Sequence, residues 1–255
     1  MSFIDVLKSY GYPVVSKEVS KRVMEYHNAM LKGSVEKSRA YQEFNGMVKG
    51  ENGKSMFNKK KWKYLIDAKF KCSHKCCDIM KKKPAELYEK QTGKKPFIGT
   101  LAEESILRKK VWIKQGCNAF TNKRPTSQPL SFWTKQDILH YAKKYNMPYP
   151  PVYGDIVLEI GNEIDNQINI IDYLGEYEAN DKLKTTGRDR TGCIFCMFGC
   201  HLEKEPNRFQ RLKESHPKQY KYCIGGGEMV DGKWQPNKEG LGLGYVLDYI
   251  GVKYE

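Results

Sequence analysis

Six of the eight cysteines in the 255-residue chain fall into two short segments. They are Cys72, Cys76 and Cys77 in the first segment and Cys193, Cys196 and Cys200 in the second. Cys193 and Cys196 have the Cys-x-x-Cys spacing, which brings two thiolates to one metal centre and also occurs in redox-active dithiols. Because these six cysteines are grouped, we do not expect them to be inert buried thiols. Cys117 and Cys223 stand apart and are expected to be core residues.

The adjacent pair Cys76-Cys77 indicates which metal centre these thiols suit. Neighbouring residues on a helix point about 100° apart, so both thiolates can hardly reach one zinc ion without strain. A four-iron cluster offers its ligand positions on separate corners and accommodates such a pair more easily. The competing pair, Cys72 with Cys76 at helical i, i+4 spacing, would suit zinc better. The residues therefore favour an iron–sulfur cluster and leave zinc as the alternative.

The composition sets limits on the class of protein. Hydrophobic residues make up 40% of the chain and aromatic residues 12%, which argues against disorder along most of its length. The formal net charge of +14 indicates an anionic partner, either a nucleic acid or a phosphate- or sulfate-bearing small molecule, and equally fits lysines spread over a solvated face. No apolar run approaches the roughly 20 residues of a membrane-spanning helix, and the first residues lack a signal-peptide layout. We expect no membrane partner and a cytoplasmic location.

Capping residues mark several helices that must position the cysteines. Ser2 with Asp5 predicts a short first helix, Ser16 predicts a second helix to about Leu31, and Thr134 with Asp137 predicts a helix over 135–145. Further helices are expected over 77–88, with a boundary at Pro84, over 102–113 and over 243–250. Strands are expected over 97–100 and as a pair within 156–172, and loops or insertions over 33–60 and 225–240. These elements predict an α/β fold with too few strands for a full doubly wound sheet.

Four motifs in a fixed order resemble the phosphoadenosine phosphosulfate (PAPS) reductase family. They occupy residues 76–84, 99–108, 129–137 and 190–196, and residues 11–18 are similar to the phage and bacterial reductase-like branch. The resemblance implies a single family domain over 1–255 with a partial, Rossmann-like sheet of the adenine-nucleotide α-hydrolase type and a cysteine-rich C-terminal region. The family's N-terminal phosphate loop has no counterpart here, and three alternatives account for this: a split gene, a partner chain that supplies the loop, or a truncated reading frame.

The resemblance also implies site residues. The family's cluster ligands match Cys76, Cys77, Cys193 and Cys196, which implies a 4Fe–4S cluster. Candidates for binding an anionic nucleotide substrate are Lys81, Glu104, Ser105, Arg108 and Arg190. The plain alternatives are a solvated lysine for Lys81, a surface ion pair for Arg108 and a local cap or ion pair for Glu104.

Three functions follow from these residues, in order of preference. The first is an oxidoreductase of the sulfonucleotide (PAPS or APS) reductase type that acts on an adenylylated sulfate in sulfur metabolism. The second is sulfur transfer onto tRNA or DNA, for which the +14 charge would bind the phosphate backbone. The third is a zinc-stabilised, non-enzymatic binding module. Reductases of the family carry a nucleophilic cysteine on a C-terminal tail, but no cysteine follows Cys223, so the catalytic residues stay unassigned.

Overall fold

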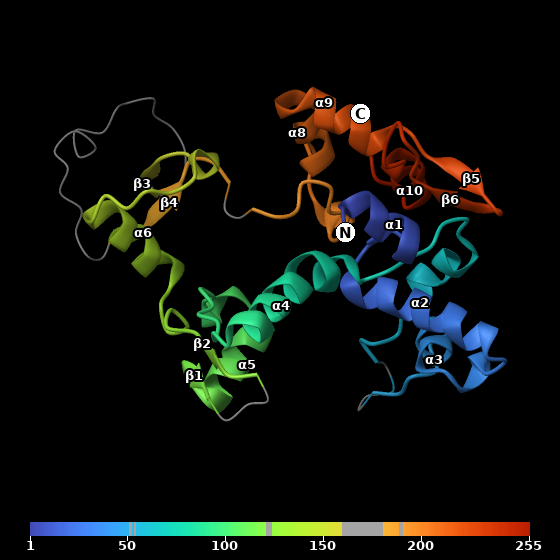
Figure 1. Cartoon of the computed structure of the whole chain (residues 1–255), viewed down its shortest axis with the longest axis horizontal. Helices are drawn as coiled ribbons and strands as arrows, with labels where there is room; N and C mark the ends of the chain where they lie inside the picture. The colour runs from blue at the N-terminus through green and yellow to red at the C-terminus, as the bar shows by residue number, and fades with distance from the viewer. Residues whose placement is uncertain (51–52, 54, 121–123, 160–180, 189–190) are drawn as a thin grey trace. The chain divides into compact units, whose positions relative to one another are not determined.

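The computed structural model describes residues 1–50, 53, 55–120, 124–159, 181–188 and 191–255. The chain forms two compact units, which are described separately (Figure 1). Unit 1 comprises Met1–Leu87 and Cys193–Glu255, and unit 2 comprises Tyr88–Gly192. The single family domain over 1–255 stays a prediction. Within the described ranges, no helix combines the length and the apolar character needed to cross a membrane.

The described residues mix helices with short strands, as predicted for an α/β fold. Unit 1 contains α1 (Phe3–Tyr10), α2 (Lys17–Leu31), η1 (Val35–Lys37), α3 (Arg39–Asn45), η2 (Lys60–Asp67), η3 (Asp78–Lys82), the start of α4 (Lys83–Thr92), η6 (Cys200–Leu202), α8 (Arg208–Ser215), α9 (Pro217–Ile224), β5 (Glu228–Val230), β6 (Lys233–Gln235) and α10 (Leu243–Tyr249). Unit 2 contains the end of α4, η4 (Ala102–Glu104), α5 (Ile106–Gln115), β1 (Asn118–Ala119), β2 (Thr126–Ser127), α6 (Lys135–Lys144), η5 (Pro151–Tyr153), β3 (Ile156–Leu158) and β4 (Leu183–Thr185).

The strands pair as three antiparallel ladders, β1–β2, β3–β4 and β5–β6. In the described part of the chain, parallel pairing is limited to isolated bridges, such as the one between Tyr12 and Cys72. Of the pair of strands expected within 156–172, the first is present as β3, which pairs with β4, and the place of the second falls in residues 160–180, outside the described residues. The expected buried strand at 97–100 is wrong, because Phe97 forms only a bridge to Ser127 and its side chain is 80% exposed.

The predicted helix starts are confirmed by their caps. Ser2 and Asp5 form a capping box on α1, the Ser16 hydroxyl accepts from the Val19 N–H on α2, and Thr134 with Asp137 caps α6. The helix expected from 102 instead begins at Ile106, because Ser105 caps it and the preceding residues form the short η4.

The segments expected to be loops contain some regular structure. Residues 33–60 include η1 and the short helix α3. Residues 225–240 include the β5–β6 hairpin, which lies beside α10 (Figure 1). The indole of Trp234 stacks on Tyr245, with ring centroids 4.6 Å apart, and donates a hydrogen bond to the Gly242 carbonyl at 2.9 Å. These contacts fix the hairpin against the start of α10.

The hydrophobic core of unit 1 joins its two sequence segments. Its fully buried members come from both segments: Val14, Val23, Phe44, Leu65, Phe70, Met197, Phe209, Cys223, Val246 and Leu247. The Tyr12 ring packs edge-on against Phe70, and its hydroxyl donates to the Leu241 carbonyl at 2.9 Å. Because burying a large apolar side chain contributes about 1.5–3 kcal/mol, this shared core holds residues 193–255 against residues 1–87.

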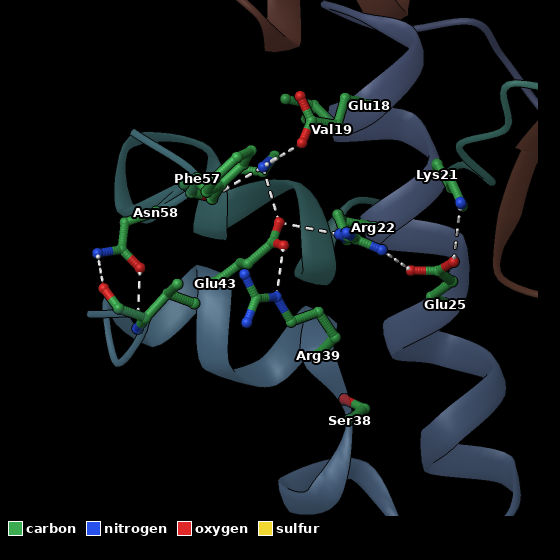
Figure 2. Close-up of polar contacts among 12 residues, drawn as sticks. Glu18, Val19, Lys21, Arg22, Glu25, Ser38, Arg39, Glu43, Phe57 and Asn58 are labelled. Atoms are coloured by element: carbon green, nitrogen blue, oxygen red, sulfur yellow. Dashed lines mark hydrogen bonds and ion pairs between the residues drawn. The ribbon is translucent and has the colours of Figure 1, made fainter. Parts of the chain in front are cut away.

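A buried carboxylate ties α2, α3 and the chain before η2 together (Figure 2). The Glu43 side chain is 1% exposed and accepts from the Arg22 Nε at 2.9 Å, the Arg39 Nε at 3.0 Å and the Lys59 Nζ at 2.7 Å. Lys59 also donates to Glu18 at 2.9 Å. Burial pushes the pKa of Glu43 upward, but hydrogen bonds from Arg22, Lys59 and Arg39 outweigh it and hold the pKa below its ordinary value.

We predict that Glu43→Gln destabilises unit 1 by about 3–5 kcal/mol, because it leaves buried cations without their carboxylate. Because the pKa of Glu43 is lowered in the folded state, its ionised carboxylate stabilises the fold above the unfolded pKa of about 4.3. This stability is lost as the pH falls through the folded-state pKa. The wild-type chain should therefore lose part of its urea resistance on going from pH 7 to below pH ~4, and the variant should lose less. Glu36→Gln, at an exposed carboxylate on η1, serves as the control. Equal unfolding free energies for the two variants would contradict the prediction.

Candidate functional site

The helix at 76–82 carries two adjacent cysteines and a lysine. Cys76 and Cys77 begin the helix, which continues as the π-helical turn η3 and then as α4. Met80 and Lys81 follow the two cysteines at a spacing of four, and residues four apart lie on the same face of a helix. The boundary predicted at Pro84 coincides with the change from the π-helical turn to α4, which begins at Lys83. Pro84 lies in the first turn of α4, where its missing N–H is tolerated.

The second pair of cysteines lies on a turn that is anchored in the core. The Cys196 N–H donates to the Cys193 carbonyl at 3.0 Å, which closes the turn. Met197 follows immediately and is completely buried, and the Phe195 ring lies 6.1 Å from that of Phe3 on α1. Gly199 has φ +78°, a conformation that favours glycine, and its N–H donates to the Val15 carbonyl at 2.8 Å. The cysteine loop, residues 193–200, is thus fixed to the N-terminal segment.

All four predicted ligand cysteines line one pocket of about 390 Å³ in unit 1. The rest of its wall consists of Phe3, Pro13, Met80, Lys81, Ile194 and Phe195. Among these described residues Lys81 is the charged one. The structure therefore brings Cys76, Cys77, Cys193, Cys196 and Lys81 together, although the two sequence segments are separated by residues 82–192.

The thiols lie close enough to influence one another's ionisation. Burial raises the pKa of Cys76 to about 12, and the neighbouring Cys77 and Cys196 add to the increase. Burial also raises the pKa of Cys196, against the opposing charge of Arg208. Thiolates crowded in an apolar pocket need a compensating positive charge, and a bound metal centre is the usual source of it in proteins.

Arg208, at the start of α8, supports the cysteine loop from the other side. Its guanidinium donates to the Cys196 carbonyl at 2.8 Å and to Glu203 at 2.9 Å through Nε. Glu203 also accepts from the Arg208 N–H at 2.8 Å. Sequence reasoning missed Arg208, because its contact is with the backbone carbonyl of Cys196 and no local sequence pattern indicates such a contact. It also missed Phe3 and Pro13, whose place in the pocket wall depends on packing between segments far apart in the sequence.

The remaining cysteines lie outside the pocket. Cys72 is buried in the core beside Tyr12, in extended chain, so the competing helical pairing of Cys72 with Cys76 does not form. Cys200 and Cys223 are buried, and burial raises their pKa values to about 11 and about 12, respectively. The core position expected for Cys223 is therefore present, whereas Cys117 is only half-buried.

The donor set can be compared with the two metal centres that the sequence leaves open. In the described residues, no three His, Cys, Asp or Glu side chains are placed to ligate a single metal ion. Four thiols line one cavity of about 390 Å³, and a 4Fe–4S cluster takes one thiolate on each of its four irons. By donor type and number the four cysteines fit a 4Fe–4S cluster, and the cluster itself stays a prediction.

The other predicted substrate-binding residues lie in unit 2 or outside the described residues. Glu104 accepts from the Leu101 N–H at 3.2 Å and forms an ion pair with Arg108, and the Ser105 hydroxyl accepts from the Arg108 N–H at 3.2 Å. The local cap and ion pair considered for these residues are thus present at the start of α5. Their role in binding substrate stays a prediction, and Arg190 lies outside the described residues.

Comparisons with known proteins place the chain in a family. No curated protein and no solved structure matches it. The model of the phosphoadenosine phosphosulfate reductase domain matches residues 20–194. This range covers more than half of the chain and includes Cys76, Cys77, Lys81 and Cys193. The chain belongs to the phosphoadenosine phosphosulfate reductase domain family.

Proposed function

We propose that this chain is an iron–sulfur protein of the sulfonucleotide reductase type, which acts on an adenylylated sulfate. The observation that carries the proposal is the single pocket lined by Cys76, Cys77, Cys193 and Cys196 together with Lys81. Membership of the family supports the class of substrate.

Cys76, Cys77, Cys193 and Cys196 would each ligate one iron of a 4Fe–4S cluster. When bound, such a cluster supplies a redox-active centre whose potential depends on nearby charge, hydrogen bonds and exposure to solvent. The side chains of Phe3, Met80, Ile194 and Phe195 make the wall around the thiols apolar, and Cys193 is the exposed one of the four cysteines. Arg208, which is itself held by Glu203, binds the Cys196 carbonyl and so fixes the backbone that carries this thiol.

Lys81 would bind the anionic end of the substrate. Its neighbour Lys82 forms an ion pair with Asp78 at 2.7 Å, whereas Lys81 lines the pocket. An ammonium group at an apolar wall attracts sulfate or phosphate oxygens through charge-assisted hydrogen bonds. Arg108 is a second candidate, because a guanidinium has five N–H donors and retains some of them beside Glu104.

We predict that the anaerobically purified chain is brown and contains about four iron atoms and four inorganic sulfides. Serine substitution of Cys76, Cys77, Cys193 or Cys196 should reduce the iron content by more than half, because each removes one thiolate ligand. Iron and sulfide analysis with visible absorption measures this directly.

Cys117→Ser is the matched control for the four ligand variants and should retain its iron. A colourless wild-type chain that carries one zinc ion would overturn the proposal and favour the zinc-stabilised module. Full iron retention by the Cys193→Ser and Cys196→Ser variants would contradict the ligand assignment.

We predict that Lys81→Gln weakens the binding of adenosine 5′-phosphosulfate roughly tenfold or more, since it removes a charge-assisted hydrogen bond. Calorimetric titration at two salt concentrations should show a weaker salt dependence in the variant. The iron content should stay at the wild-type level, which separates a loss of substrate binding from a loss of the cluster.

Lys83→Gln removes a neighbouring exposed lysine from the same run and should leave the affinity within about twofold of wild type. Equal affinities for the Lys81→Gln and Lys83→Gln variants would mean that Lys81 does not contact the anion.

A further inference from the structure

A turn with a strained backbone precedes α2 and contacts the cysteine loop. Val15 has φ +61° and is 2% exposed. A β-branched residue very rarely adopts a positive φ, because its Cβ approaches the following carbonyl oxygen. Such a conformation persists only where the surroundings hold it in place, and it is concentrated at functional sites.

The hydroxyl of Ser20 holds this turn. Ser20 is completely buried on α2, and its Oγ accepts from the Val14 N–H at 3.0 Å and donates to the Val14 carbonyl at 2.7 Å. One side chain therefore satisfies both backbone polar groups of a completely buried residue. Ser16 caps α2 through the Val19 N–H. The helix cap and the hydrogen bonds to Val14 therefore come from different serines.

The strained turn contacts the pocket in two ways. Its Pro13 lines the pocket beside the thiols, and the Val15 carbonyl accepts from the Gly199 N–H at 2.8 Å. Gly199 lies near the end of the cysteine loop and itself has a positive φ. The conformation of Val15 therefore determines where the cysteine loop is attached.

We propose that Ser20, Val15 and Gly199 form a latch that positions Cys193 and Cys196 for the cluster, with Ser20 as a positioning residue. The inference rests on the proposed function for its effect on the cluster. The latch itself is a property of the metal-free chain: Ser20 holds Val14, the turn keeps Val15 at positive φ, and the Val15 carbonyl holds the cysteine loop.

The first experiment measures amide hydrogen exchange in the metal-free chain. In Ser20→Ala, the buried Val14 N–H and carbonyl lose their partner, so the Gly199 amide should exchange roughly tenfold faster than in wild type. Ser38→Ala is the matched control, because Ser38 caps α3 in the same unit through the Tyr41 N–H and otherwise bonds to the Val35 carbonyl, away from the turn. It should leave Gly199 exchange within about twofold of wild type.

A second pair of variants changes the backbone and leaves Ser20 in place. Val15→Gly keeps the carbonyl and adopts a positive φ readily, so Gly199 should stay protected. Val15→Pro fixes φ near −65°, which the latch cannot accommodate, so protection should be lost. Should Val15→Pro fail to fold, Ser20→Ala still decides the inference.

The second experiment follows iron loss to a chelator under anaerobic conditions by visible absorption. Iron should leave Ser20→Ala at least about threefold faster than Ser38→Ala, and the Val15→Gly rate should match wild type. Identical Gly199 exchange in Ser20→Ala and Ser38→Ala would overturn the latch. Faster exchange with unchanged iron loss would overturn the positioning role. A wild-type chain without iron would refute the proposed function, while the exchange result would still decide the latch.

Discussion

The burial of Met197 and Cys200 in the same core as Tyr12 and Phe70 is the interaction on which the pocket depends. The two cysteine segments are joined by a long stretch of chain, and closing such a loop costs about 4 kcal/mol. Full burial of Met197 contributes about 1.5–3 kcal/mol, and the contacts of Phe195 with Phe3 and Tyr222 add to it. Apolar packing thus offsets loop closure, and the polar anchors at Gly199 and Arg208 then fix where the thiols point.

The basic character of the chain has several structural uses. Arg22, Arg39 and Lys59 surround one buried carboxylate, Glu43, so part of the positive charge stabilises the packing of α2 against α3. Arg208 binds a backbone carbonyl of the cysteine loop. Lys81 differs from these residues, because it lines the pocket that holds the thiols. A net charge therefore says little about function until the cations held within the fold have been distinguished from those at a site.

The helix starts could be predicted because a cap involves residues three or four positions apart, as at Ser2, Ser16 and Thr134. The grouping of Cys76, Cys77, Cys193 and Cys196 could be predicted from the order of the motifs, which the family resemblance supplies. Phe97 was placed in a buried strand, and Cys72 was considered on a helix with Cys76, because a short apolar run or a spacing of four does not reveal which segments pack on it. Most partners of Ser20, Glu43 and Arg208 lie more than one helical turn away in the sequence, so no local pattern identifies their roles.

The π-helical turn η3 separates the cysteine pair from the remainder of α4. A π turn contains one residue more than an α turn over the same hydrogen-bonded length, which is equivalent to a one-residue insertion in a regular helix. The pocket side chains Cys76 and Cys77 precede this extra residue, and the body of α4 follows it. Relative to Cys76 and Cys77, the side chains of α4 therefore point about 100° away from the directions that an uninterrupted α-helix would give them. Removing a single residue from Asp78–Lys82 would convert the π turn to an α turn and leave the later side chains of α4 in their present directions, whereas the same deletion within the regular part of α4 would turn every later side chain by roughly 100°.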